Sequence, residues 1–380
     1  MNLELLNHLF SEVKTPELYG RYITNSDIEK CLGNLSKPKI STIGYSVEER
    51  PIYSLKLGNG PIKILLWSQM HGNESTSTKA LFDCFNLFET DHELGKRFLE
   101  ECTLMVIPVL NPDGAERYTR VNANEVDLNR DAQDLSQPES KVLRHIYTDF
   151  KPDYCFNLHG QRTIFSAGET EHVATLSFLS PAQDEERQLT TNRKAAMAII
   201  AEINELLQSE IPNAIGRYDD GFNLNCVGDT FQNFGVPTLL YEAGHYKNDY
   251  DREEVRRLMF VAILKGLDVI VNGVDISKYE AYFGIPENAK CFYDIIIRNA
   301  KCSHLDDLVD IAIQYKEVLI EGKLQFVPIV EELSKLNNKY GHKEIEANGF
   351  LVKTTDNFDL ITGSEIDFVI VNNERISLKP

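Results

Sequence analysis

Apolar runs alternate with segments of helical periodicity along the first 270 or so residues of the chain. Near-continuous apolar runs at 61–68, 102–110 and 236–244 are typical of strands that are buried on both faces. Between and after them, residues 75–89, 138–150 and 252–271 place apolar side chains at helical spacing. The pattern predicts an α/β fold, with a mixed, mainly parallel twisted sheet flanked by helices.

Further elements fit the same plan. Residues 39–46 and 51–58 flank the turn "VEER" and predict a hairpin. Shorter strands are expected at 153–160 and 174–180, and a long helix at 184–208. The N-terminus has acidic residues among its leucines and predicts a short amphipathic helix.

The pattern changes after residue 274. Residues 273–290 lack periodicity and contain Gly and Pro, so they predict a linker. Beyond it, short β-rich pieces occur at 318–326, 349–355 and 366–373. We therefore expect a catalytic domain over 1–275 and a small, mostly β domain over 290–380, to which the pattern assigns no chemistry and no role.

Composition narrows the function classes. The net charge of −19 disfavours nucleic acid and anionic membrane surfaces as partners. No apolar run approaches the roughly 20 residues of a membrane span, and the N-terminus lacks the basic start and cleavage site of a signal peptide. The seven cysteines are odd in number and never spaced C-x-x-C, which favours reduced thiols and a cytoplasmic protein.

Chemistry-bearing residues follow four of the predicted strands. His71 and Glu74 come directly after the first buried strand, His159 ends another, and Glu242 ends a third. The fourth strand runs into a polar loop at 111–131 that contains three arginines. Because sites in open α/β sheets lie beyond the carboxyl ends of strands, these features predict one site.

Two imidazoles and a carboxylate are the ligand set of a catalytic zinc that keeps a fourth position open. His71, Glu74 and His159 can supply it, and the chain has no His-Glu-x-x-His motif that would indicate a helical site. A carboxylate outside the metal ligands must then accept and return a proton, and Glu242 is available. We expect one Zn²⁺ per chain.

The order of these elements resembles that of the zinc metallocarboxypeptidases. His71-x-x-Glu74, "NPDG", Arg120, "DLNR", His159 and Glu242 recur in that order at fitting distances over roughly residues 40–270. The resemblance implies a hydrolase that removes C-terminal residues from peptides with a free terminal carboxylate.

The resemblance also implies individual roles. His71, Glu74 and His159 would bind zinc, and Glu242 would be the general base and acid. Arg120 would stabilise the oxyanion, with Arg117 as a rival for this role. The implied substrate-binding residues are Asn129 and Arg130 for the terminal carboxylate, Tyr218 as a mobile cap, and Asp229 in the pocket loop.

The chain departs from the digestive-type members at several positions. Gly72 and Asn73 stand where those enzymes have an Arg, and Gly160 and Gln161 follow the third ligand in place of Ser-Tyr. "HGNE" and "DLNR" also resemble the aspartoacylases and succinylglutamate desuccinylases, so a zinc-dependent N-acyl amino acid deacylase is the alternative. A catalytically inactive binding protein is a third hypothesis. Residue preference at the substrate C-terminus, ordinary against cell-wall peptides, and oligomeric state stay open.

Overall fold

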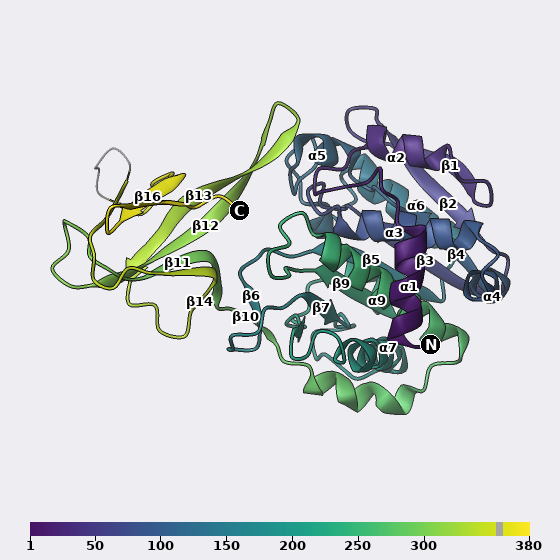
Figure 1. Ribbon diagram of the computed structural model, residues 1–380. Helices are drawn as coiled ribbons and strands as arrows, with labels where there is room; N and C mark the ends of the chain where they lie inside the picture. Colours follow the sequence, from purple (N-terminus) through teal and green to yellow (C-terminus); the bar gives the residue numbers. More distant parts are fainter. Residues whose placement is uncertain (355–359) are drawn as a thin grey trace.

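The structure, a computed structural model, describes residues 1–354 and 360–380. Within these ranges, eight strands form one twisted sheet in the order β1-β2-β4-β3-β5-β9-β7-β8 (Figure 1). They are β1 (Lys39–Tyr45), β2 (Pro51–Leu57), β3 (Ile62–Ser68), β4 (Cys102–Ile107), β5 (Tyr154–Gly160), β7 (Leu176–Leu179), β8 (Ile215–Arg217) and β9 (Thr238–Ala243). Strands β4, β3, β5 and β9 run parallel, while β1, β2 and β7 join antiparallel. The predicted mixed, mainly parallel sheet is confirmed.

Helices cover both faces of this sheet. Strand β3 shows how: Ile64 and Leu66 join one buried cluster, while Leu65 and Trp67 join another on the opposite face. The first cluster packs against α1 (Leu3–Val13), α3 (Thr76–Glu89), α7 (Thr191–Leu207) and α9 (Glu253–Val271), and the second against α6 (Pro138–Phe150) and α8 (Val227–Asn233). Helices α2 (Asn25–Leu32), α4 (Glu93–Glu101) and α5 (Pro112–Arg117) also contribute buried residues to the first cluster. In the described ranges, no helix has the length and hydropathy needed to cross a membrane.

Two predicted segments differ in the structure. The helix expected over 184–208 begins only at Thr191, because the side chain of Thr190 accepts the backbone N–H of Arg193 and caps it. The expected linker contains a 3₁₀ helix, η2 (Ile276–Gly284), that packs on α7 and buries Tyr282. A single buried side chain, that of Tyr282, is too weak a pattern to reveal such a helix in the sequence.

The C-terminal region has a hydrophobic core of its own. A four-stranded sheet contains β13, β12, β11 and β14 in that order, and a three-stranded sheet contains β15, β16 and β17. Their bounds are β11 (Phe292–Ala300), β12 (Val309–Ile320), β13 (Lys323–Ser334), β14 (Tyr340–Glu346), β15 (Val352–Thr354), β16 (Phe368–Val371) and β17 (Glu374–Ser377). Apolar residues of both sheets share one buried cluster. The end of the piece predicted at 349–355 lies outside the described residues. The boundaries 1–275 and 290–380 stay a prediction.

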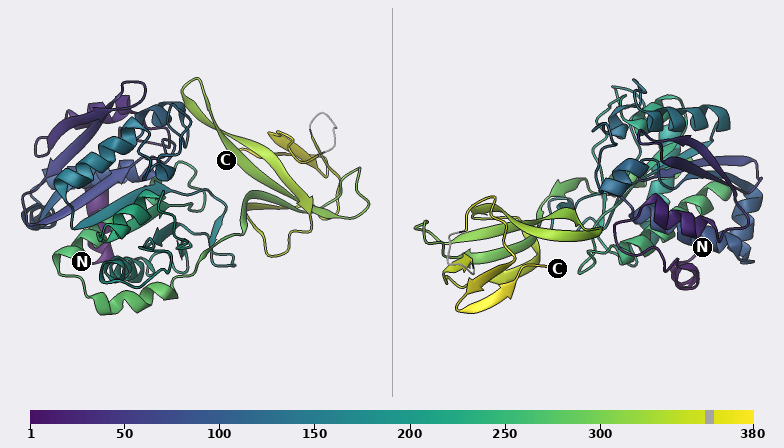
Figure 2. Two further views of the ribbon diagram at one scale, coloured as in Figure 1. Left: turned by 180° about the vertical axis from the view of Figure 1, so that it is seen from behind. Right: turned by 90° about the horizontal axis from the view of Figure 1, so that it is seen from above.

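The two regions meet along a polar interface. Strand β10 (Asn288–Lys290) pairs with β6 (Phe165–Ala167) of the first region. The β12–β13 hairpin reaches towards α5 (Figures 1 and 2). On it, Glu317 accepts a hydrogen bond from the hydroxyl of Tyr118 and pairs with Arg21 at 2.7 Å. The hairpin therefore lies against the first region at the end of the sheet where the predicted site residues lie.

Candidate active site

The turn after β3 carries His71 and Glu74. Its first residue, Gln69, adopts a left-handed backbone conformation with φ of 45°, and its buried side chain donates hydrogen bonds to the carbonyls of Ile23 and Gly72. A side chain at Gly72 is impossible without rearrangement, because its Cβ would lie 1.9 Å from the carbonyl carbon of Gly114. Gly72 therefore lets this turn pack directly against α5.

Three side chains converge at the carboxyl ends of β3 and β5. His71 Nδ1 lies 2.9 Å from Glu74 Oε1, His159 Nδ1 lies 2.9 Å from Glu74 Oε2, and the two Nδ1 atoms are 3.1 Å apart. Ligands about 2.0–2.1 Å from a tetrahedral zinc stand roughly 3.3 Å from one another, so this triangle needs only a slight expansion. Within the part of the chain that the structure describes, it is the one cluster that could hold a metal ion. The donor set therefore fits zinc.

Each donor is oriented by a further contact. Asp127 Oδ1 lies 3.0 Å from His71 Nε2, and this contact directs the other ring nitrogen towards the cluster. Glu74 Oε2 accepts the backbone N–H of Gly160 at 3.0 Å. Sequence reasoning did not assign a role to Asp127. The motif "DLNR" begins with Asp127, two residues before Asn129, to which the resemblance does assign a role.

The pKa values of the three side chains in the cluster depend on one another. Burial by itself lowers the pKa of His71, but the carboxylates of Glu74 and Asp127 outweigh it and raise that pKa to about 9. Burial dominates at His159 and lowers its pKa. Burial would raise the pKa of Glu74, yet the two imidazoles hold it far below its usual range. Metal binding at such a site releases any proton held by the ligand nitrogens.

Glu242 lies on β9, directly opposite His159 in the parallel register. Its Oε2 is buried and has no hydrogen-bond partner among the described residues. Burial, reinforced by the nearby charge of Glu74, raises the pKa of the Glu242 carboxyl well above its usual value. A carboxyl group in this environment is suited to hold a proton near neutral pH.

The structure separates the two candidate arginines of the 111–131 loop. Arg120 lines the cavity, with Nη1 at 3.6 Å from Glu74 Oε1 and Nε donating to Asp127 at 3.0 Å. Arg117 pairs with Glu48 and does not line the cavity. Arg120 is therefore the arginine placed to act on a bound substrate.

Asn129 and Arg130 lie on the 3₁₀ helix η1 (Leu128–Arg130), next to α8. The side-chain oxygen of Asn129 accepts the N–H of Val227, so its amide nitrogen is left to donate elsewhere. Arg130 is exposed and forms no ion pair with any described carboxylate; its Nη1 contacts its neighbour's carbonyl and Cys226 Sγ at 3.1 Å. Asp131 instead accepts hydrogen bonds from residues 136–137.

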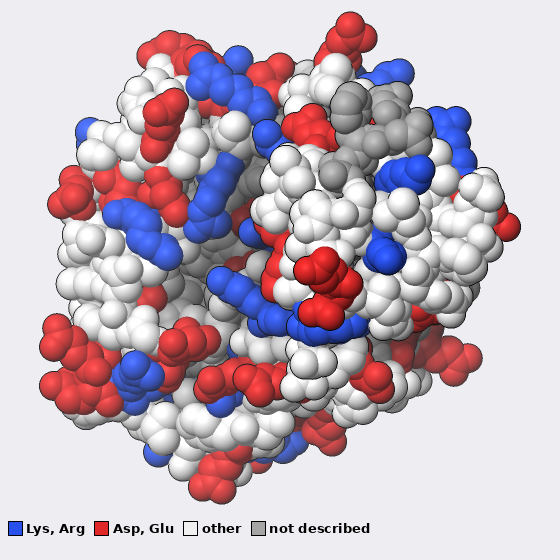
Figure 3. Space-filling model, turned by 90° about the vertical axis from the view of Figure 1, so that its left-hand side faces the viewer, with Lys and Arg blue, Asp and Glu red and all other residues white. Residues whose placement is uncertain are grey.

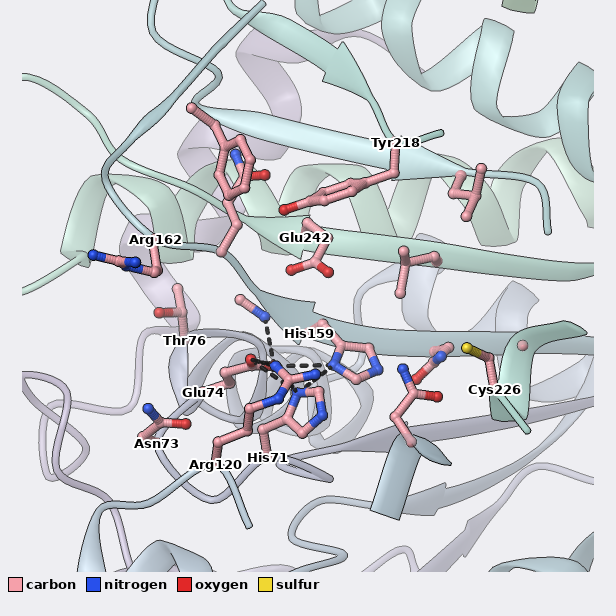
Figure 4. Close-up of a pocket in the computed structure, with 18 of the residues that line it drawn as sticks. His71, Asn73, Glu74, Thr76, Arg120, His159, Arg162, Tyr218, Cys226 and Glu242 are labelled. Atoms are coloured by element: carbon pink, nitrogen blue, oxygen red, sulfur yellow. Dashed lines mark hydrogen bonds and ion pairs between the residues drawn. The ribbon is translucent and has the colours of Figure 1, made fainter. Parts of the chain in front are cut away.

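Tyr218 and Asp229 also line the cavity. Tyr218 follows β8, and its side chain points towards Glu242 (Figure 4). Asp229 is buried at the start of α8, and burial raises its pKa to about 6. All nine predicted site residues thus line one cavity, although their individual roles stay predictions.

The cavity has a volume of about 690 Å³ and two distinct ends. Cys226 lies on one side of the His71–Glu74–His159 cluster, and Asn73, Thr76 and Arg162 lie on the other (Figure 4). On the Arg162 side the wall includes three residues of β12, namely Tyr315, Lys316 and Glu317. The sequence pattern gave the C-terminal region no role, yet it forms part of this wall.

The sequence model of the zinc carboxypeptidase family matches residues 34–250. The chain belongs to the zinc carboxypeptidase family. The match contains all nine site residues and ends before the C-terminal region.

Individual members of the family are more distant. The chain is 32% identical over 183 residues to carboxypeptidase SOL1 of Arabidopsis thaliana, covering 41% of this chain and 37% of the relative. It is 30% identical over 146 residues to carboxypeptidase E of Caenorhabditis elegans, covering 31% of each chain. The matches thus span only about a third of the length of these curated relatives.

Solved carboxypeptidase structures share the fold. A metallo-carboxypeptidase from Burkholderia cenocepacia superimposes with a TM-score of 0.51 at 18% identity, covering 65% of this chain and 70% of that one. Carboxypeptidase A from Helicoverpa armigera gives a TM-score of 0.52 at 17% identity, covering 71% and 80%. These likenesses confirm the zinc carboxypeptidase architecture of the α/β region.

Proposed function

We propose that this zinc carboxypeptidase family member is a zinc-dependent hydrolase that removes C-terminal residues from peptides. The observation that carries the proposal is one cavity with three parts. It holds three converging side chains that can bind a metal. Among the described residues, it also holds a buried carboxylate oxygen of Glu242 without a hydrogen-bond partner and an arginine, Arg130, without a carboxylate partner.

His71, Glu74 and His159 would hold one zinc ion per chain. Bound zinc lowers the pKa of water and polarises a carbonyl group. Glu242 accepts the proton of the attacking water at its free Oε2 and returns it to the amine nitrogen of the leaving residue. Its raised pKa allows it to keep this proton between the two events.

Arg120 and Arg130 interact with different groups of the substrate. Arg120 lies at the metal cluster, where a fixed cation stabilises the oxygen that becomes negative as the peptide carbonyl is attacked. Arg130 and the free amide of Asn129 lie at the Cys226 end, where they can bind the terminal carboxylate of the substrate. Tyr218 and Asp229 would complete the pocket for the terminal residue.

We also propose a cytoplasmic location. Five cysteines are buried free thiols, namely Cys31, Cys84, Cys102, Cys155 and Cys291. Buried thiols of this kind suit a reducing compartment.

Zinc analysis combined with a substrate screen tests the proposal. The purified protein should contain about one zinc per chain, and mass spectrometry should show loss of single C-terminal residues from free-acid peptides. Removal of zinc by a chelator should abolish this activity without unfolding the protein, because the large hydrophobic core does not depend on the metal. Full activity of the metal-free protein would contradict the assignment of the ligands.

The same screen should include N-acyl amino acids. Release of the acyl group with peptides left intact would identify the deacylase alternative. Binding of peptides without turnover of either class, in zinc-loaded protein, would indicate an inactive binding protein.

A further inference from the structure

The residues of the cavity define the orientation of a bound peptide, provided that the proposed carboxypeptidase function holds. Arg130 and Asn129, which would bind the terminal carboxylate, lie at the Cys226 end. The scissile bond must lie at the metal cluster, next to Glu242. The peptide chain that precedes this bond therefore runs to the opposite end, towards Arg162 (Figure 4).

Two cations without partners form part of the wall at this upstream end. Arg162, three residues after His159, and Lys316, on β12, both line the cavity and are both exposed. In the described part of the chain, neither forms an ion pair or a hydrogen bond through its side chain.

The domain interface brings these two residues to the same part of the wall. Gln314 Nε2 donates to Thr163 Oγ1 at 2.8 Å, and His342 contacts the carbonyl of Thr163 at 2.8 Å, so the backbone next to Arg162 is held by the C-terminal region. Lys316 lies two residues after Gln314 and thus on the same face of β12. The two side chains therefore enter the wall from adjacent points.

Nearby charges add to this positive potential. Arg252 also lines the cavity, and its guanidinium donates to the carbonyls of Ala243 and Gln161 without a carboxylate partner among the described residues. The acidic neighbour on β12, Glu317, is already paired with Arg21. The face of the molecule in Figure 3 is hollowed, and Asp and Glu as well as Lys and Arg side chains lie around the hollow. The upstream end is thus locally cationic in a protein of net charge −19.

We propose that the substrate is acidic upstream of the scissile bond, and that Arg162 and Lys316 bind Asp or Glu side chains there. The C-terminal region then has a function: its β12 strand supplies half of this subsite. The subsite selects among peptides, whereas the residues near the zinc ligands carry out hydrolysis.

A peptide series measures this selectivity. All peptides keep the C-terminal residue that the screen finds best, and each of the three preceding positions carries Glu, its neutral isostere Gln, or Lys. At low salt, kcat/KM for Glu should exceed that for Gln by about threefold to thirtyfold at one or more positions, as expected for two partly exposed charge pairs. Lys should be the poorest residue there. High salt should reduce the Glu-to-Gln ratio.

Three variants locate the effect. Arg162→Gln and Lys316→Gln should each lower the Glu-to-Gln ratio several-fold, and the double variant should bring it close to one. Lys323→Gln is the matched control, because it removes the same charge from the same hairpin at a position outside the cavity wall, and it should leave the ratio unchanged. Melting curves verify that each variant is folded.

A wild-type ratio near one, or a ratio that survives in the double variant, would overturn the subsite while leaving the peptidase proposal intact. If no peptide is cleaved, the peptidase proposal fails, and calorimetry of the zinc-loaded protein then tests the wall alone. In that measurement Glu-rich peptides should bind more tightly than Gln-rich ones, and equal affinities would refute the cationic subsite.

Discussion

The metal-ligand cluster and the upstream wall of the same cavity are built in opposite ways. His71 and His159 are buried, and together with Glu74 they are held by partners such as Asp127 and the Gly160 N–H. Arg162 and Lys316 are exposed and have no partner among the described residues. Side chains that are held in place by hydrogen bonds suit catalysis. Exposed cations without partners at the edge of a cavity suit the binding of an anionic substrate.

The metal-ligand cluster and the upstream wall also differ in their position relative to the family match. All three ligands and Glu242 lie within the 34–250 family match, whereas Lys316 lies far beyond it. Substitutions on β12 should therefore alter substrate choice without disturbing the residues proposed to hold zinc. The following predictions test whether the metal-ligand cluster carries out hydrolysis while the upstream wall selects the substrate, beginning with the largest effect.

Glu242→Gln should remove most of the turnover while keeping the zinc. The amide cannot accept a proton from water, and general acid–base groups contribute roughly 10²–10⁴-fold to rates. Elemental analysis and single-turnover kinetics measure the two properties separately. Glu74→Gln is the informative companion, since it should lose the metal; loss of zinc from the Glu242 variant instead would make Glu242 a ligand.

Arg130→Ala should lower kcat/KM on free-acid peptides by about 10- to 100-fold, the range for losing a charge-assisted hydrogen-bonded pair. Activity on C-terminally amidated peptides, already low, should fall much less. Arg117→Ala serves as a control, because Arg117 lies on the same loop but pairs with Glu48 outside the cavity. Amides cleaved as fast as free acids by the wild type would show that the enzyme is not a carboxypeptidase.

Asp127→Asn should weaken zinc binding by about 10- to 100-fold, because the carboxylate orients the ring of His71 and increases its basicity. Competition with a chromogenic chelator measures this affinity without reference to activity. Asp134→Asn removes the same charge from an exposed position of the following loop and should leave zinc affinity unchanged. Equal affinities of the two variants would mean that Asp127 does not support the ligand.

The domain interface should be weakened by acid. The rings of His245, which is buried, and His342, which is half-buried, lie 4.2 Å apart near Arg252, and Arg21 also acts on His245. Burial, together with these cations, lowers the pKa of His245 well below its usual value, and burial lowers that of His342 to about 4. Unfolded histidines titrate near pH 6.5, so the unfolded state binds more protons below this pH. The free energy of unfolding should then fall by about 1.4 kcal/mol per pH unit for each histidine as pH decreases from 6.5 towards 4.

Urea denaturation at a series of pH values measures this slope, and His342→Gln should reduce it while keeping a donor for the carbonyl of Thr163. Asp294, whose pKa burial raises to about 6, opposes the effect below pH 6, but it does so equally in both proteins. Identical slopes for the variant and the wild type would exclude His342 as the source.

The α/β sheet and the residues of the candidate metal site could be predicted from the amino-acid sequence alone. Buried strands such as 61–68 and 102–110 are continuous apolar runs, and their period is visible without neighbours. The ligands follow strand ends, so parallel pairing alone brings His71 and His159 together, and it also places Glu242 opposite His159. Local sequence patterns are sufficient to predict a site when the pairing of parallel strands allows only one arrangement of the residues at the strand ends.

The pairing of the charged residues, in contrast, becomes visible only in the folded chain. Arg117 and Arg120 look alike in sequence, and Glu48 removes one of them from the site by an ion pair across 69 positions. In the sequence, Asp127 is one of three Asp residues in the 111–131 loop, and only its contact with His71 in the folded chain distinguishes it. The role of β12 was hidden because Lys316 reaches the cavity through contacts between two domains, such as Gln314 with Thr163. Such contacts depend on the packing of distant surfaces, which carries no periodic signal along the chain.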